Sequence, residues 1–72
     1  MSDVWVYDKK PTTPGWYAVL ICWDVQEGLI PSTAFWRDGS WVREHPYVAH
    51  AGPFDTSDAA YKHAWDNDPE GI

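Results

Sequence analysis

The residues that most often bind metals, cysteine and histidine, are scattered along this sequence. Cys22 is the only cysteine, and the three histidines are His45, His50 and His63. None of the spacings typical of zinc sites, such as Cys-x-x-Cys or His-Glu-x-x-His, is present. His45 and His50 lie five residues apart, but Pro46 and an extended backbone would keep them from converging. We therefore expect no metal site and no disulfide.

Catalytic nucleophiles and phosphate-binding loops are equally hard to find. No Gly-x-Ser-x-Gly turn surrounds any serine, and Cys22 lies in an apolar run where a buried, unreactive thiol is expected. The five glycines are isolated from one another and suit turns rather than a phosphate cradle. A chain of 72 residues is also short for both a core and a ligand pocket of about 300–1,000 Å³. We predict that the protein is not an enzyme and carries no cofactor.

Aromatic residues are the most unusual feature of the composition, with six Trp, four Tyr and two Phe. A buried aromatic ring removes about 150–250 Å² from water, so several of these rings must build the core. They cannot all be interior in so short a chain, and exposed Trp, Tyr and Arg supply much of the binding energy at protein interfaces. The residues that we expect to stay partly exposed and to contact a protein partner are Trp5, Arg37, Trp41, Arg43, Tyr61 and Trp65.

The formal net charge of −6 argues against direct nucleic-acid binding, which needs clustered Lys and Arg. Lys9 and Lys10 are the only adjacent basic residues. Acidic side chains gather in the last third of the chain, at Asp55, Asp58, Asp66, Asp68 and Glu70. They favour solubility, and as an alternative they form an acidic face that mimics DNA. In a further alternative, exposed aromatic rings stack a small nucleotide signal that two subunits sequester between them.

Targeting signals are missing from the sequence. The acidic start, Met1-Ser2-Asp3, does not resemble a signal peptide, and the apolar run 16–23 is far shorter than the roughly 20 residues of a membrane span. With a lone thiol and no export signal, we expect a cytoplasmic protein that does not bind membranes.

Hydrophobic patterning predicts a single small domain over residues 1–72, with a core over about 4–66 and a tail over 67–72. Strands are expected at 4–7, 16–23 and 29–37, with one more short strand at 47–51 that Gly52-Pro53 would end. Asp38-Gly39 predicts a tight hairpin with positive φ at both positions. Thr56 or Ser57 can cap a helix over 56–66. The predicted fold is α+β: a three- to four-stranded antiparallel meander with one C-terminal helix packed on it.

The apolar surfaces of the predicted sheet and helix bear on whether the protein forms a dimer. Both alternating sets of the strand 16–23 are apolar, the set that begins at Trp16 and the set that begins at Tyr17, so both faces of the strand need a cover. The expected inner stripe of the helix is narrow, with Ala59, Ala60, His63 and Ala64. Either this chain covers the second face or another copy does, and on this ground we predict a homodimer.

Three segments together resemble small domains of unknown function encoded in bacteriophage and prophage genes. They are Pro14-Gly15-Trp16-Tyr17-Ala18-Val19, then Phe35-Trp36-Arg37-Asp38-Gly39-Ser40-Trp41, then Gly52-Pro53-Phe54-x-Thr56-x-x-x-Ala60. The resemblance covers about residues 11–65, and its motifs are turn and core residues with no catalytic residue among them.

This resemblance implies a bacterial host cell and a partner from that host. Very small, acidic, non-enzymatic phage proteins often act as stoichiometric binders of a host enzyme or defence complex, among them anti-CRISPR and anti-restriction proteins. The expected function is therefore binding and inhibition of a host defence or nucleic-acid-processing complex. A structural accessory protein without inhibitory activity is the alternative within the same context.

Overall fold

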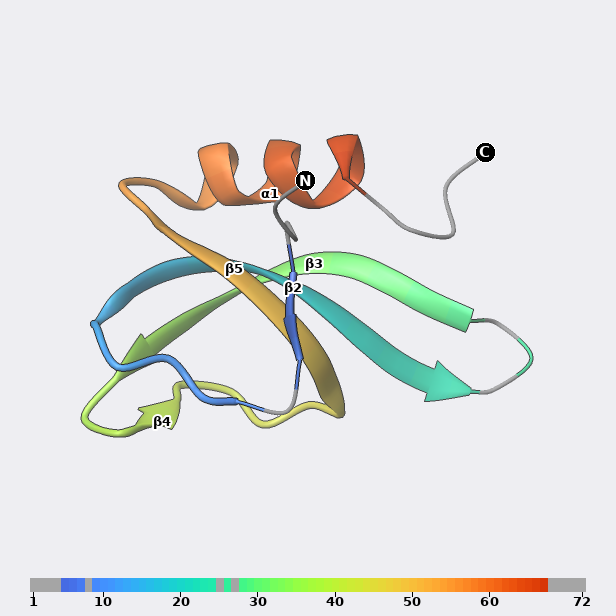
Figure 1. Cartoon of the computed structure of the whole chain (residues 1–72), viewed down its shortest axis with the longest axis horizontal. Coiled ribbons are helices and arrows are strands. Elements are labelled where there is room, and N and C mark those ends of the chain that lie inside the picture. Colours follow the sequence, from blue (N-terminus) through green and yellow to red (C-terminus); the bar gives the residue numbers. More distant parts are fainter. Residues whose placement is uncertain (1–4, 8, 25, 27, 68–72) are drawn as a thin grey trace.

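A computed structural model describes residues 5–7, 9–24, 26 and 28–67, and the backbone alone for Trp23 and Asp24. Five strands form one antiparallel sheet that curls into a half-barrel, and one helix packs on it (Figure 1). The elements are β1 (Val6–Tyr7), β2 (Gly15–Asp24), β3 (Gly28–Arg37), β4 (Ser40–Trp41), β5 (Tyr47–Phe54) and α1 (Ser57–Asp66). The predicted α+β class and C-terminal helix are confirmed. The side chain of Trp23, the last residue of the predicted strand 16–23, lies outside the described residues.

The strand order β1-β5-β2-β3-β4 shows that the predicted meander is wrong. β4 pairs with β3 through only two residue pairs, Trp36 with Trp41 and Arg37 with Ser40. The chain then leaves that edge, crosses the sheet and enters as β5 between β1 and β2. β2 pairs with β5 on one edge and with β3 on the other, so it is the central strand of the sheet. The sheet therefore has five strands rather than three or four.

The Asp38-Gly39 turn is confirmed, with φ of 54° and 79° at its two positions. The expected end of β5 at Gly52-Pro53 is wrong, because this strand continues to Phe54. Trp16 pairs with Phe54 and Ala18 with Ala51, so β5 advances three residues where β2 advances two. This irregularity accommodates Pro53, which has no N–H to donate to a sheet.

The two faces of β2 supply two separate cores. Ala18 and Leu20 face the helix, where they pack with Ala49, Ala51, Ala60, Ala64 and Trp5. Tyr17, Val19 and Ile21 face the other way and pack with Ala34 and Trp36. The alternation expected from the sequence is therefore confirmed for the described side chains of β2.

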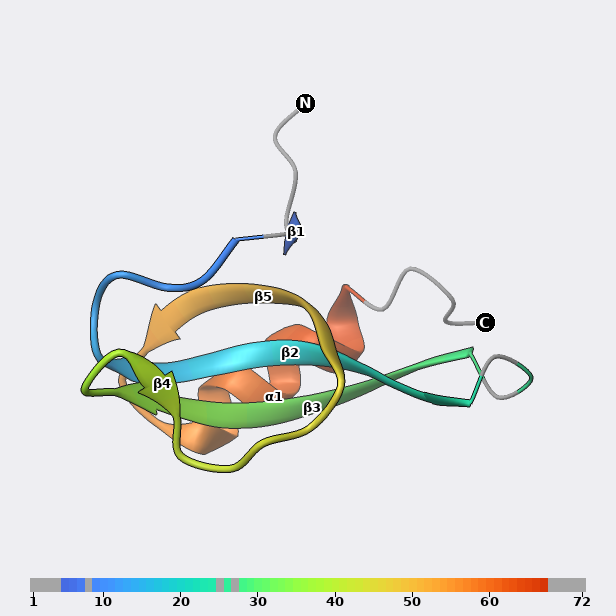
Figure 2. The same cartoon turned by 90° about the horizontal axis from the view of Figure 1, so that it is seen from below.

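The chain itself covers the second face of the sheet. Residues 42–46 run across it between two backbone hydrogen bonds, Val42 N–H to the Phe35 carbonyl at 2.9 Å and Cys22 N–H to the Pro46 carbonyl at 3.1 Å. Figure 2 shows β4 and this segment on the side of the sheet opposite α1. The five residues at the centre of that core are buried without a second copy: Tyr17, Val19, Ile21, Ala34 and Trp36. The argument for a homodimer from an uncovered face is therefore weakened.

Helix α1 begins and ends as its sequence dictates. The Thr56 hydroxyl accepts a hydrogen bond from the Ala59 N–H at 3.1 Å, which is the N-cap interaction expected of threonine. Asn67 forms the C-cap, so this residue belongs to the fold rather than to a tail. The inner stripe is narrower than expected: Ala60 and Ala64 are buried, whereas Ala59 is exposed.

Candidate functional site

The six predicted contact residues do not lie on one surface. Trp5 is buried, with 7% of its surface exposed, and the expectation that it stays exposed is wrong. Its ring packs on the alanine face of α1 and its Nε1–H donates to the Asn67 carbonyl at 2.8 Å. The remaining five divide between the outer face of α1 and the β3–β4 hairpin with the segment that follows it.

Tyr61 and Trp65 lie on the outer face of α1, and we refer to them as the helix aromatic pair. They are four residues apart, are 50% and 51% exposed, and contact each other edge to face with ring centroids 6.1 Å apart. Beside them Lys62 donates to the Asp66 carboxylate at 2.8 Å. The predicted exposure of this pair is confirmed.

Arg37, Trp41 and Arg43 belong to the β3–β4 hairpin and to the segment that follows it. Arg37 and Arg43 are exposed, as expected for a contact surface. Trp41 is only half-buried, and its ring contacts Trp36 and Tyr47 with centroids 5.0 and 4.9 Å apart. Trp41 therefore supports the core and presents part of its ring to solvent.

The acidic residues proposed as an alternative face are only partly described. Asp55, Asp58 and Asp66 are exposed around α1, whereas Asp68 and Glu70 lie outside the described residues. Asp58 occupies the first helical turn, where a carboxylate favours the helix dipole, and Asp66 is paired with Lys62. Helix stability thus accounts for two of the three described carboxylates.

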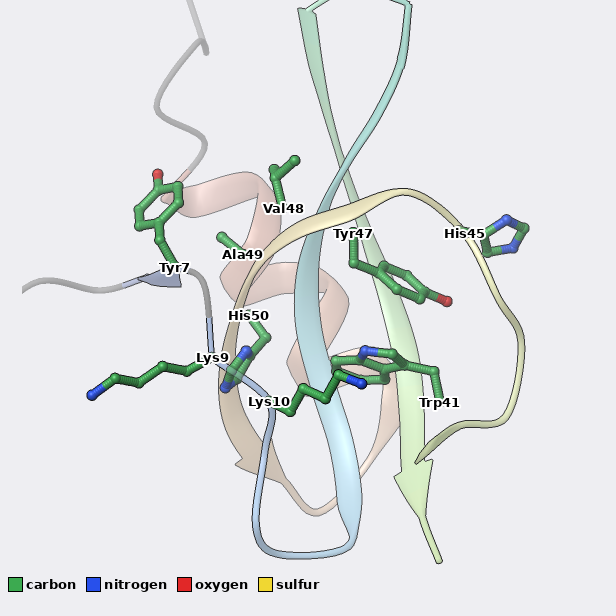
Figure 3. A pocket seen from close by; sticks show the side chains of 9 residues that line it. All are labelled: Tyr7, Lys9, Lys10, Trp41, His45, Tyr47, Val48, Ala49 and His50. Atoms are coloured by element: carbon green, nitrogen blue, oxygen red, sulfur yellow. The ribbon is translucent and has the colours of Figure 1, made fainter. Parts of the chain in front are cut away.

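A cleft of about 510 Å³ opens on the face of the sheet opposite α1, and we call it the aromatic cleft (Figure 3). Residues from β1, from the segment that follows it, from β4 and from β5 meet there. The lining residues are Tyr7, Lys9, Lys10, Trp41, His45, Tyr47, Val48, Ala49 and His50.

Two polar side chains of the cleft are desolvated. Burial lowers the pKa of His50, which is 8% exposed, so its imidazole is neutral at physiological pH. Burial raises the pKa of the Tyr47 hydroxyl, while the nearby Arg43 charge lowers it. The Tyr47 hydroxyl donates to the Arg43 carbonyl at 2.7 Å, which connects β5 to the crossing segment. The cleft therefore presents neutral aromatic groups on its floor.

Potential metal ligands, the cysteine and the helix give no indication of a further site outside this cleft. Among the described residues, no group of three or more His, Cys, Asp or Glu is placed to hold a metal ion. Cys22 is half-buried rather than fully buried as expected. Within the described part of the chain, no helix has the length and apolar character that a membrane crossing requires.

Most residues of the cleft were not predicted from the sequence. Lys9 and Lys10 could have indicated an anion-binding site, because they are the only adjacent basic residues of an acidic chain. Tyr7, Tyr47 and His50 carried none, because only the position of β5 beside β1 brings them together.

Comparison with known proteins gives this fold no relative. No protein family, no curated protein and no solved structure matches the chain.

Proposed function

We propose that the protein is a non-enzymatic binding protein that contacts a host protein through the helix aromatic pair. The observation that carries the proposal is the half-exposed state of Tyr61 and Trp65, side by side on a helix whose opposite side is fixed to the sheet. Exposed Trp and Tyr on a rigid element are typical binding hot spots, because they bury much area and lose little conformational freedom.

The charged side chains around the helix aromatic pair indicate what kind of surface the partner presents. Asp55, Asp58 and Asp66 are exposed on this side, with Lys62 as the basic residue of α1. Amphipathic helices commonly bind in an apolar groove of a partner, with anchors one turn apart. The partner therefore offers an apolar groove with Arg or Lys at its rim.

The resemblance to small phage and prophage domains supports a more specific form of this proposal. In that form the partner is a host defence or nucleic-acid-processing complex, and the protein inhibits it stoichiometrically. This part rests on the turn and core motifs at residues 14–19, 35–41 and 52–60.

The test is capture from host lysate with immobilised wild-type protein and variants, followed by mass spectrometry. We expect wild type to retain a partner that Tyr61→Ala/Trp65→Ala loses. The matched control is Val42→Ala, because Val42 is a similarly exposed apolar residue, 52% exposed, away from α1. Equal capture by the helix variant and the control would overturn the proposal.

A second copy of this chain is the competing occupant of the helix face. Light scattering at tens of micromolar separates the two cases. A monomer mass supports a foreign partner. A dimer that Tyr61→Ala/Trp65→Ala converts to monomer would assign the face to self-association instead.

A further inference from the structure

We infer that the aromatic cleft binds a nucleoside phosphate: Trp41 stacks on the base, Lys9 and Lys10 hold the phosphate, and His50 donates or accepts a hydrogen bond. The site is distinct from the helix aromatic pair, because the two lie on opposite sides of the sheet (Figures 1 and 3). A failure of either proposal therefore leaves the other standing.

Trp41 is fixed in place before any ligand arrives. Tyr17 and Trp36 contact its ring nearly perpendicularly, at interplanar angles of 90° and 80°, and Tyr47 lies against it at 44°. The ring is nevertheless only half-buried and lines the cleft. A fixed indole with an uncovered part is a stacking platform, and every nucleobase has a flat face to stack on one.

His50 is a largely buried polar residue that lines the cleft. It is 8% exposed. Its neighbours are rings: Tyr17 at 5.5 Å and Trp41 at 6.1 Å between centroids. A neutral imidazole carries one donor and one acceptor, so His50 can hydrogen-bond with the polar edge of a base or sugar in the cleft.

Charge in the cleft favours an anion although the whole chain is acidic. Lys9 and Lys10 are exposed and line the cleft, and none of the nine lining residues is acidic. Pro11, directly after the lysines, is buried and anchors their segment to the domain. Two ammonium groups match one phosphate or diphosphate better than a polynucleotide, whose binding requires more cations.

The size of the cleft agrees with a ligand of this class. Its volume of about 510 Å³ falls within the range of about 300–1,000 Å³ that holds small molecules.

The test is a titration of the isotope-labelled protein, followed by NMR and calorimetry, with adenosine 5′-monophosphate, adenosine and inorganic phosphate. We expect the nucleotide to bind with a dissociation constant of about 1 mM or tighter and to shift the Trp41 indole and His50 signals. Adenosine and phosphate alone should each bind about tenfold more weakly, because each uses only part of the site.

Two double variants that remove the same amount of positive charge test the cleft residues. Lys9→Gln/Lys10→Gln should weaken nucleotide binding about tenfold or more, through loss of charge-assisted contacts. Arg37→Gln/Lys62→Gln removes the same charge elsewhere and should leave affinity unchanged. No response to the nucleotide, signals that shift outside the cleft, equal weakening by both double variants, or phosphate or adenosine binding as tightly as the nucleotide would overturn the proposal.

Discussion

The indole Nε1–H of Trp5 donates to the backbone carbonyl of Asn67 at 2.8 Å, across 62 positions of sequence. Asn67 is also the C-cap of α1, where carbonyl groups lack helical partners. One hydrogen bond therefore connects the residue that precedes β1 to the end of the helix. The edge strand and the helix are thus stabilised by the same ring.

Replacement of Trp5 by Phe tests this connection. The aromatic packing against Ala60 and Ala64 is largely kept, while the Asn67 carbonyl loses its donor. We expect the free energy of unfolding to fall by about 1 kcal/mol or more, measured by urea denaturation. Trp5→Ala also empties the ring's site and should cost about 3–5 kcal/mol. Equal, negligible losses for both variants would contradict the observed burial of Trp5.

A comparison of Gly52 with Gly39 separates the cost of backbone strain from the cost of a steric clash. Both have positive φ, 135° and 79°. A Cβ at Gly52 would meet the Tyr17 and Phe54 rings at 3.1 Å, whereas one at Gly39 has nothing within 4 Å. We expect Gly39→Ala to cost about 1 kcal/mol from strain alone and Gly52→Ala to cost clearly more. Thermal unfolding of the two variants gives the comparison, and the reverse order would contradict it.

Two substitutions of Thr56, the N-cap of α1, should destabilise the protein to different extents. Thr56→Ala removes the acceptor for the Ala59 N–H and should destabilise the protein by about 1 kcal/mol, whereas Thr56→Ser keeps the hydroxyl and should cost little. Chemical denaturation of both variants checks this. A similar loss in the two would mean that the Thr56 methyl group, not its hydroxyl, stabilises the helix.

His50 predicts a pH dependence of stability. Its pKa is lowered by burial from 6.5, so the unfolded chain binds its proton more readily than the folded protein does. The free energy of unfolding has its full value above pH 6.5, and it falls as the pH drops below 6.5 toward the pKa of His50 in the folded state. Urea denaturation between about pH 5 and 8 should show this loss in wild type and a flatter profile in His50→Gln. Identical profiles would exclude His50 as the cause.

Local patterns in the sequence were sufficient for the parts of the fold that local chemistry determines. The Asp38-Gly39 turn, the cap at Thr56 and the two apolar faces of β2 follow from backbone preferences and side-chain alternation. The exposure of Tyr61 and Trp65 follows from their place outside the Ala60/Ala64 stripe.

Long-range pairing could not be predicted in the same way. Nothing in residues 42–46 indicates that this segment crosses the sheet, so the insertion of β5 between β1 and β2 was not foreseen. The burial of Trp5 depends on that insertion, because β5 is the strand that β1 pairs with among the described residues. The aromatic cleft depends on it as well, since it joins residues from β1 and β5.

A DNA mimic built from the exposed acidic residues is the alternative to the proposed aromatic mode of binding. A DNA mimic presents carboxylates to a basic groove, so its affinity falls steeply as salt rises. An aromatic anchor buries Trp and Tyr, and its affinity changes only modestly with salt. Asp68 and Glu70 lie outside the described residues, and Asp66 is paired with Lys62.

The most direct measurement is a calorimetric titration of the captured host partner at low and high salt. It compares wild type, Trp65→Ala and Asp55→Asn/Asp58→Asn. We predict that Trp65→Ala costs about 2 kcal/mol or more of binding free energy at both salt concentrations, and that the Asp variant costs less. A hundredfold loss of wild-type affinity with salt, together with normal binding by Trp65→Ala, would contradict the helix aromatic pair as the binding surface.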